Sequence, residues 1–253
     1  MNIQMLVTDL DGTLLHTDKT ISEYTASVFR RCRERGMKIV FATARPARNL
    51  AQFTQTVQPD AIISDNGARA FINGQAILQR DVSPEAVAQI VETLLPLVGI
   101  RLHLNYEHTS FTNHETWRSW GSWGVQYSDF SYYDPCGVQK IAIEAQDISL
   151  LSHVDFEALG CHFTGSQGEK WYLVTAKTVA KRNGIEAVAA HFGIPLAGIA
   201  AFGDDQIDIE MLRLCGAGVA VANAIDEAKA AANDLCGSND DDGPAHWIEK
   251  NLL

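Results

Sequence analysis

The sequence lacks the marks of several protein classes. Its 20 basic residues are outnumbered by 31 acidic ones, the formal net charge is −11, and lysine and arginine form no run. These features argue against nucleic acid and anionic membranes as partners. The five cysteines are odd in number and never in CxxC spacing, so we expect neither a disulfide framework nor a thiolate zinc site. Apolar runs are too short to span a membrane, and the amino terminus has no secretory pattern. We therefore expect a cytoplasmic protein.

The composition that remains suits a folded α/β protein. Hydrophobic residues make up 46% of the 253 residues, enough for one large domain or for a core with an inserted module. Apolar runs at 3–8, 37–42 and 61–64 are typical of buried strands, and helical patterns at 22–35 and 46–57 separate them. This alternation predicts a parallel sheet with right-handed crossovers, in which ligands bind beyond the carboxyl ends of the strands.

The middle of the chain has a different pattern. Residues 81–175 contain one helical stretch, 84–97, and strand-like runs around a loop rich in aromatic residues. Beyond them the alternation resumes, with helix 179–192, strand 198–202, helix 208–214, strand 217–221 and helix 225–232. We predict an α/β fold with a Rossmann-like three-layer core, made of a parallel sheet from residues 1–80 and 176–253, and an inserted α+β cap domain.

The sharpest local signal is Asp9-Leu10-Asp11-Gly12-Thr13, where two carboxylates follow a buried strand at a glycine turn. A calcium loop is a poor alternative, because its twelfth position, counted from Asp9, is Thr20 rather than glutamate. A dinucleotide-binding enzyme would need a G-x-G-x-x-G turn at this place. The pair suits phosphate chemistry instead, since one carboxylate can attack phosphorus while the other transfers protons.

Attack on a phosphate by a carboxylate requires a cation. Two such groups about 4 Å apart repel by roughly 4 kcal/mol per charge pair at an effective dielectric constant near 20. We therefore predict Mg²⁺ as cofactor. Asp204 and Asp208 follow another strand end and would join Asp9 and Asp11 as metal ligands. The alternative is that Asp204 or Asp205 only caps a helix.

Phosphate oxygens would find donors at two further places. Thr43 and Ala44 offer a hydroxyl and backbone N–H groups at the start of the next predicted helix. Lys181, near the start of another helix, could supply a point charge. An ordinary helix cap and a solvated lysine are the alternatives. Arg45, beside the first place, is a candidate substrate contact.

Four stretches of the chain resemble, in order, the four motifs of the haloacid dehalogenase superfamily: Asp9-Leu-Asp-Gly-Thr, Thr43 with Arg45, Lys181, and Gly203-Asp204-Asp205-x-x-Asp208. The sequence is most similar to the Cof-type phosphatases, which carry a large α/β cap between the second and third motifs. The likeness extends to Asn66-Gly67-Ala68, Ile209-Glu210-Met211-Leu212, Val219-Ala220-Val221-Ala222-Asn223-Ala224 and Ser238-Asn239-Asp240-Asp241-Asp242-Gly243.

The resemblance implies roles for these residues. It makes Asp9 the nucleophile and Asp11 the general acid and base. It also implies a cap that closes over the substrate. The implied phosphate and metal sites are Thr43 and Lys181 for phosphate, and Asp9, the Asp11 carbonyl, Asp204 and Asp208 for Mg²⁺.

The sequence departs from the family pattern at three positions. Ile207 stands where family members usually carry asparagine, and Arg182 and Ala44 stand where glycine is usual or common. None of these departures removes a charged catalytic group.

Specificity for the substrate is expected in the cap. Candidate residues there are Arg101, His103, Asn105, His108, His114, Arg118, Trp117, Trp120, Trp123 and Tyr127. Packing of the cap's own core is the alternative for the tryptophans. We expect hydrolysis of small phosphate monoesters, sugar phosphates above all. The alternatives are a phosphomutase, a dedicated sugar-phosphoglycerate phosphatase, or a catalytically weak binder of phosphorylated ligands, for which Ile207 is the hint.

Overall fold

The structure is a computed structural model that describes residues 2–116, 124–165 and 170–253. The chain divides into two compact units. The first consists of Met1–Gln79 and Ala180–Leu253, and the second, Arg80–Val179, is inserted between them. The second unit ends beyond residue 175 because the strand Trp171–Ala176 belongs to it. In the described part of the chain, no helix is both long and apolar enough to cross a membrane.

The first unit is built on an eight-stranded sheet with the order β14-β13-β12-β1-β2-β3-β4-β5. Its first six strands are parallel. They are β1 (Met5–Thr8), β2 (Lys38–Ala42), β3 (Ala61–Ser64), β12 (Ile199–Gly203), β13 (Ala217–Ala220) and β14 (Asp234–Leu235). Strand β1 lies between β2 and β12, so the two separate segments of the chain meet along the middle of the sheet.

The last two strands, β4 (Arg69–Ile72) and β5 (Gln75–Gln79), form an antiparallel hairpin at the sheet edge. The sequence analysis did not predict them. Their turn is Asn73-Gly74, and both residues have positive φ angles, of 51° and 76°. An Asn-Gly pair between short apolar runs is a signal for a tight hairpin, and this signal could have found the two strands.

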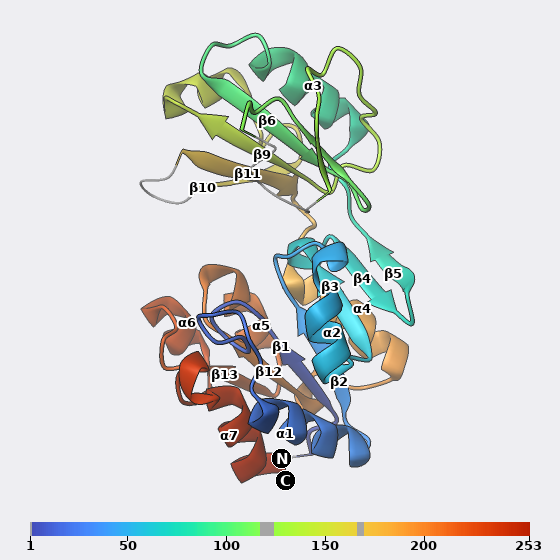
Figure 1. The fold of residues 1–253 in the computed structure, drawn as a ribbon, viewed down its shortest axis with the longest axis vertical. Helices are drawn as coiled ribbons and strands as arrows, with labels where there is room; N and C mark the ends of the chain where they lie inside the picture. The colour runs from blue at the N-terminus through green and yellow to red at the C-terminus, as the bar shows by residue number, and fades with distance from the viewer. Residues whose placement is uncertain (1, 117–123, 166–169) are drawn as a thin grey trace. The chain divides into compact units, whose positions relative to one another are not determined.

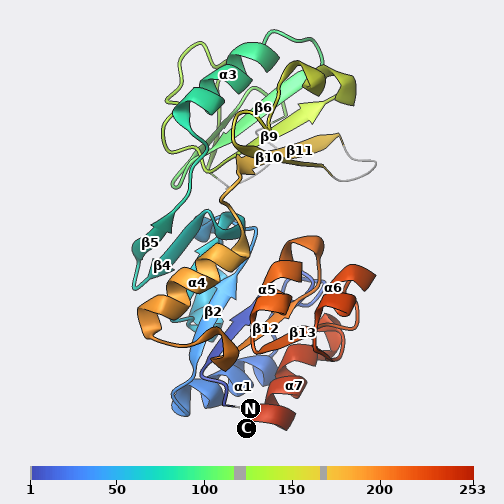
Figure 2. The ribbon, with the colours of Figure 1, turned by 180° about the vertical axis from the view of Figure 1, so that it is seen from behind.

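Helices cover both faces of this sheet, as Figures 1 and 2 show from opposite sides. On one face lie α1 (Glu23–Glu34), α2 (Ala51–Val57) and α7 (Gly243–Leu252), which share a core with Leu6 of β1. On the other lie α4 (Lys181–Phe192) and α5 (Ile209–Leu214), packed against Met5 and Val7. The helix α6 (Asp226–Ala231) packs beside α5. Burial on both faces explains the continuous apolar strands, and the predicted three-layer α/β core is confirmed.

Two helix predictions need correction. The predicted helix 46–57 is a 3₁₀ turn, Ala47–Asn49, followed by α2, because Pro46 is extended. Helix α7 was missed, although it begins with Gly243 and carries Pro244 in its first turn, where proline suits a helix start. Trp247 and Ile248 of this helix are buried in the core.

The second unit has a six-stranded sheet with the order β10-β11-β9-β6-β7-β8. The strands are β6 (Ile100–Asn105), β7 (Ser110–Thr112), β8 (Val125–Tyr127), β9 (Lys140–Ala145), β10 (Cys161–Gly165) and β11 (Trp171–Ala176). Leu102 and Leu104 of β6 share a buried core with Ile90 of helix α3 (Pro84–Leu94). Because side chains alternate along a strand, Arg101, His103 and Asn105 lie on the opposite face.

Close packing fixes where α4 begins in the first unit. A Cβ atom at Gly184 would lie 2.4 Å from Cγ2 of Ile63 on β3. At Gly67, whose φ is +97°, a Cβ atom would lie 2.1 Å from the carbonyl oxygen of Ala180. The absence of these two side chains lets the helix rest directly on the sheet, and Lys181 is its first residue.

We expect Gly184→Ala to destabilise the protein by about 1–3 kcal/mol, because the added methyl overpacks the contact with Ile63. The expected loss of stability is opposite in sign to the effect of intrinsic helix propensity, which favours alanine over glycine by about 1 kcal/mol. Urea unfolding measures the difference. Arg182→Ala, at an exposed position of the same helix, is the control and should change stability little. A Gly184→Ala protein as stable as wild type would contradict the close approach.

Candidate active site

Three carboxylates meet where β1 and β12 end. The two strands pair in parallel with Thr8 opposite Phe202, and the N–H of Asp9 donates to the carbonyl of Phe202 at 3.0 Å. Asp9, Asp204 and Asp208 then each offer a carboxylate oxygen, and these atoms all lie within 4.8 Å of one another. The structure thus brings together three of the four predicted metal residues.

Lys181 reaches into this cluster from the first turn of α4. Its Nζ lies 2.5 Å from Oδ1 of Asp9 and 2.7 Å from Oδ1 of Asp208, and only 2% of the residue is exposed. The alternative of a solvated lysine is therefore wrong. Burial would lower the pKa of the ammonium, but the charges of Asp9 and Asp208 outweigh it and raise the pKa.

Asp9 is the most perturbed carboxyl group of the cluster. It is 5% exposed, and burial raises its pKa to about 7 even though Lys181 opposes the shift. The neighbouring charges of Asp208 and Asp204 raise the pKa further. One ammonium is therefore too little positive charge for the carboxylates around it.

Asp208 braces the turn that follows β12. Its Oδ2 accepts hydrogen bonds from the backbone N–H groups of Asp204 and Asp205 at 3.0 and 3.1 Å, while its Oδ1 accepts from Lys181. Asp205 accepts from the N–H of Gln206 and caps the 3₁₀ turn Gln206–Asp208. The capping alternative therefore holds for Asp205, whereas Asp204 belongs to the carboxylate cluster.

Ile207, which replaces the asparagine usual in the family, lies in this same turn and is 41% exposed. The carboxylate of Asp208 accepts hydrogen bonds from the backbone N–H groups of Asp204 and Asp205 and not from position 207. Isoleucine at position 207 therefore leaves these hydrogen bonds unchanged.

Asp204 is held from the other side of the site. Its Oδ1 accepts from the hydroxyl of Thr13 at 2.7 Å, and a Cβ atom at Gly12 would lie only 2.4 Å from its Oδ2. Gly12 has a φ of +81°, so both its backbone and its surroundings require glycine. Burial raises the pKa of Asp204 to about 6.

The donor set fits a divalent cation bound by oxygen. Asp9 and Asp204 contribute carboxylate oxygens from two neighbouring strand ends, which suits a hard ion. Both oxygens of Asp208 already accept hydrogen bonds, so this residue is placed to orient the others.

Asp11 faces two cations outside the carboxylate cluster. Arg45 donates from Nε to Oδ2 at 2.5 Å and from Nη2 to Oδ1 at 2.7 Å, and Nζ of Lys19 lies 2.8 Å from Oδ1. The hydrogen bond from Arg45 is the main cause that lowers the pKa of Asp11 to about 2, against burial and with help from Lys19. Asp11 is therefore ionised. The sequence analysis missed Lys19, and no local pattern marks it.

Thr43 directly follows β2. It is 1% exposed, its N–H donates to the carbonyl of Ile63, and its Oγ1 accepts from the N–H of Arg45 at 3.1 Å. A hydroxyl that accepts one hydrogen bond can still donate its own proton. Ala44 is exposed. The backbone of Asn66 also donates to the carbonyl of Thr43, at 3.0 Å.

Arg101, His103 and Asn105, three of the predicted specificity residues, share one face of the sheet of the second unit. Arg101 donates from Nε to Glu115 at 3.1 Å, and Nε2 of His103 lies 3.2 Å from Oδ1 of Asn105. Arg118, Trp117, Trp120 and Trp123 lie outside the described residues.

His114 belongs to the same unit. Its Nε2 lies 3.0 Å from Glu144, and its ring stacks on Trp171 with centroids 6.1 Å apart. The sequence analysis did not single out Glu144 or Trp171, because they come from β9 and β11, far along the chain from His114. His108 and Tyr127 are exposed.

Comparison with known proteins identifies the family of the chain. The profile of the haloacid dehalogenase-like hydrolases matches residues 6–248. The chain is 28% identical over 270 residues to the 5-amino-6-(5-phospho-D-ribitylamino)uracil phosphatase YitU of Bacillus subtilis, covering 97% of this chain and 96% of that protein. It is 28% identical over 239 residues to the HMP-PP phosphatase of Escherichia coli O157:H7, covering 88% and 85%. A solved structure described as a HAD subclass IIB sugar phosphatase matches with a TM-score of 0.81, 25% identity and 98% coverage of both chains.

The chain therefore belongs to the haloacid dehalogenase-like hydrolase family. The predicted superfamily, its Cof-type branch and the predicted class of enzyme, a phosphatase, are confirmed at this level.

The raised pKa of Asp204 predicts how stability depends on pH. Because folding raises this pKa from 3.8 to about 6, the folded state favours the protonated carboxyl group. The resulting stabilisation is complete below about pH 4 and is lost as the pH rises through about 6. At pH 8, without divalent cations, Asp204→Asn should therefore stabilise the protein by about 1 kcal/mol after allowance for solvent screening, or about 2–4 °C in Tm.

Thermal unfolding at pH 4 and pH 8, with and without Mg²⁺, tests this expectation. The gain should vanish at pH 4, and Mg²⁺ should raise the Tm of wild type but not of Asp204→Asn. Asp205→Asn is the matched control, because it removes a neighbouring exposed charge and keeps a good capping residue. Equal Tm values for both variants at pH 8 would contradict the burial of charge at Asp204.

Proposed function

We propose that the protein hydrolyses small phosphate monoesters, sugar phosphates above all, with Mg²⁺ and through an aspartyl-phosphate on Asp9. The observation that carries the proposal is the meeting of Asp9, Asp204 and Asp208 around Lys181 at the ends of β1 and β12. The printed names of the relatives support it, since they describe phosphatases of phosphorylated metabolites.

Asp9 is the proposed nucleophile. Lys181 binds its Oδ1, which orients the carboxylate and leaves Oδ2 to attack phosphorus. The bond from Oδ2 to phosphorus forms as the bond from phosphorus to the ester oxygen breaks. Lys181 and Thr43 hold the phosphate oxygens. Mg²⁺, held by Asp9, Asp204 and the carbonyl of Asp11, would supply the positive charge that offsets repulsion between carboxylate and phosphate.

Asp11 is the proposed general acid and base. In the first step its carboxyl proton would pass to the leaving alkoxide, and in the second step its carboxylate would take a proton from the water that attacks phosphorus and frees Asp9. The structure holds Asp11 in its ionised form through Arg45 and Lys19. This is the form that the second step uses, and for the first step these two cations must release the carboxylate so that it can carry a proton.

The inserted unit is proposed as the cap that selects the substrate. Arg101, His103 and Asn105, on the face of β6 opposite helix α3, are the proposed contacts, together with Arg118, and Arg45 is proposed to serve from the core. Hydrogen-bonding side chains on a sheet face suit the hydroxyl groups of a sugar. The cytoplasmic location stays a prediction.

Replacement of the nucleophile is the decisive test. Asp9→Asn keeps the shape of the side chain but removes its nucleophilic oxygen, so we expect phosphate release from p-nitrophenyl phosphate to fall by about a thousandfold or more. Asp205→Asn should stay close to wild type, and chelation by EDTA should stop the wild type. Acid quenching during turnover of a ³²P-labelled ester should leave label on wild type and none on Asp9→Asn. Equal release by wild type and Asp9→Asn would refute the assignment.

A panel of phosphorylated sugars and nucleotides tests the substrate class. We expect measurable Mg²⁺-dependent hydrolysis of several hexose and pentose phosphates, with kcat/KM values above those for nucleotides. A requirement for a hexose bisphosphate would identify a phosphomutase instead. Activity on one sugar phosphoglycerate alone would identify a dedicated enzyme, and binding without release would identify a weak phospho-ligand binder.

A further inference from the structure

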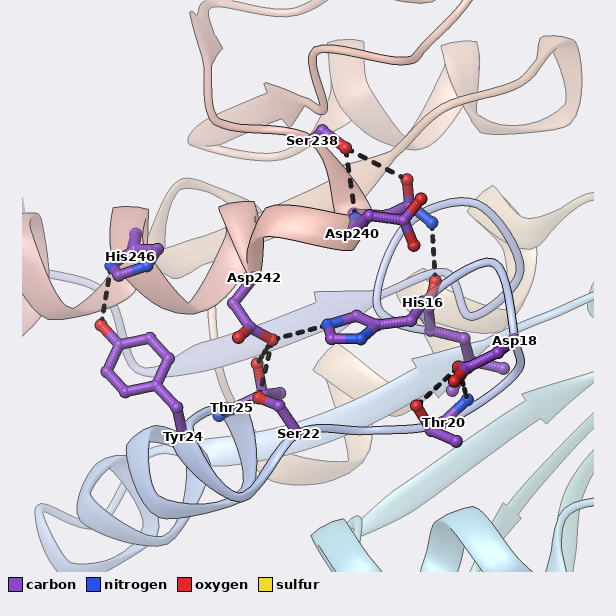
Figure 3. Close-up of polar contacts among 12 residues, drawn as sticks. His16, Asp18, Thr20, Ser22, Tyr24, Thr25, Ser238, Asp240, Asp242 and His246 are labelled. Carbon is purple, nitrogen blue, oxygen red and sulfur yellow. Dashed lines mark hydrogen bonds and ion pairs between the residues drawn. The ribbon is translucent and has the colours of Figure 1, made fainter.

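The loop that follows the catalytic strand is tied to the carboxyl-terminal part of the chain. We use "post-nucleophile loop" for residues 12–22 and "clasp" for residues 238–242. Figure 3 shows the side chains of the two segments pointing toward one another, with the clasp at the start of helix α7. The two segments are more than 200 positions apart in the sequence.

Asp242 is the centre of the clasp. Its Oδ1 lies 3.0 Å from Nε2 of His16 and accepts from the hydroxyls of Ser22 at 2.7 Å and Thr25 at 2.8 Å. His16 lies in the middle of the loop, Ser22 at its end and Thr25 in the first turn of α1. Asp242 has a φ of +52°, a conformation that only a few residue types adopt readily. One carboxylate therefore fixes both ends of the segment between His16 and α1.

The rest of the clasp binds the loop backbone. Asp240 accepts from both the N–H and the hydroxyl of Thr17, at 2.6 and 2.7 Å. Asn239 donates from Nδ2 to the carbonyl of Leu15 at 2.9 Å. Hydrogen bonds that a backbone N–H donates to a carboxylate are stronger than neutral ones, so Asp240 anchors the loop at Thr17.

The start of the loop is held through Asn223. Its Nδ2 donates to the carbonyl of Gly12 at 2.7 Å, and its Oδ1 accepts from the N–H of Asn239 at 3.0 Å. Gly12 directly follows Asp11. The clasp thus reaches the backbone next to the proposed acid and base through one intervening side chain.

The loop in turn presents Lys19 to Asp11. The N–H of His16 donates to the carbonyl of Thr20 at 3.0 Å, and the N–H of Lys19 donates to the carbonyl of His16 at 2.9 Å. Lys19 has a φ of +67°, and its Nζ lies 2.8 Å from Oδ1 of Asp11. The clasp holds this turn at His16 and Thr17, so the place of Lys19 depends on it.

We propose that the clasp is a positioning device for Asp11, with Asp242 as its main positioning residue and Lys19 as the link. This inference rests on the proposed function, in which Asp11 transfers the protons. A surface loop without such anchors is mobile, and a catalytic group displaced by about 1 Å loses much of its rate advantage. The clasp acts through the loop and does not touch the substrate.

The second step of the reaction tests the positioning of Asp11, because this step uses the ionised form that Arg45 and Lys19 hold. In single-turnover measurements with ³²P-labelled p-nitrophenyl phosphate, whose leaving anion needs no proton, formation and breakdown of the labelled Asp9 are followed separately. Asp242→Ala should slow breakdown of the labelled Asp9 by about tenfold or more. Its formation should change less than about threefold.

Three variants serve as matched controls. Asp242→Asn keeps an acceptor oxygen and a residue suited to positive φ, so it should restore most of the rate. Asp241→Ala removes the neighbouring carboxylate, which is exposed, and should match wild type. Lys19→Met should reproduce the selective loss, and adding Asp242→Ala to it should cost little more, because both act on the same link.

The outcomes distinguish the clasp from the function it rests on. An equal decline in the formation and the breakdown of labelled Asp9, or losses in the double variant that multiply, would overturn the positioning role and leave the phosphatase assignment standing. A wild-type protein that releases no phosphate would overturn both.

Discussion

The site depends on the burial of Lys181 between Asp9 and Asp208. Removing charged groups from water costs several kcal/mol for each ion, so such a group persists only where partners surround it. The close contact of Gly184 with Ile63 seats α4 on the sheet and thereby places this ammonium at the strand ends. When all three carboxylates are ionised, the single ammonium leaves an excess of about two negative charges in the cluster. A divalent cation would neutralise this excess. Burial is the main cause of the raised pKa values of Asp9 and Asp204, and the charges of neighbouring carboxylates add to it.

Sheet topology explains why these groups meet. Strand β1 pairs with β2 on one side and β12 on the other, so the loops that follow the three strands open at one edge. Asp9, Thr43 and Asp204 are the first polar residues after the buried parts of these strands. The order β13-β12-β1 also brings Asn223, which follows β13, beside Gly12. The second segment of the core therefore supplies Asp204, Asp208 and the clasp.

The sequence was sufficient to predict the parts of the fold that follow a simple hydrophobic pattern. Buried parallel strands are continuous apolar runs, and their carboxyl ends converge, so the cluster of Asp9, Asp204 and Asp208 was predictable. Helix α7 and the β4–β5 hairpin were missed because their signals, a helix-start proline and an Asn-Gly turn, were not weighed. The pairing of Lys19 with Asp11 carries no local signal at all. It depends on a turn that residues more than 200 positions away hold in place.

Asp9 and Asp11 are two residues apart, yet their pKa values lie at about 7 and about 2. Asp9 is buried and shares one ammonium with a second carboxylate, so burial dominates. The side chain of Asp11 is 36% exposed and pairs with two cations, Lys19 and Arg45. Hydrogen bonding therefore dominates the shift of its pKa. A strand followed by a glycine turn creates this contrast, because it directs one side chain into the sheet edge and the other toward the loop. Divergent pKa values in neighbouring carboxyl groups are how acid and base roles are separated. In this protein Arg45 makes the largest contribution to the low pKa of Asp11, and Lys19 adds to it from the loop.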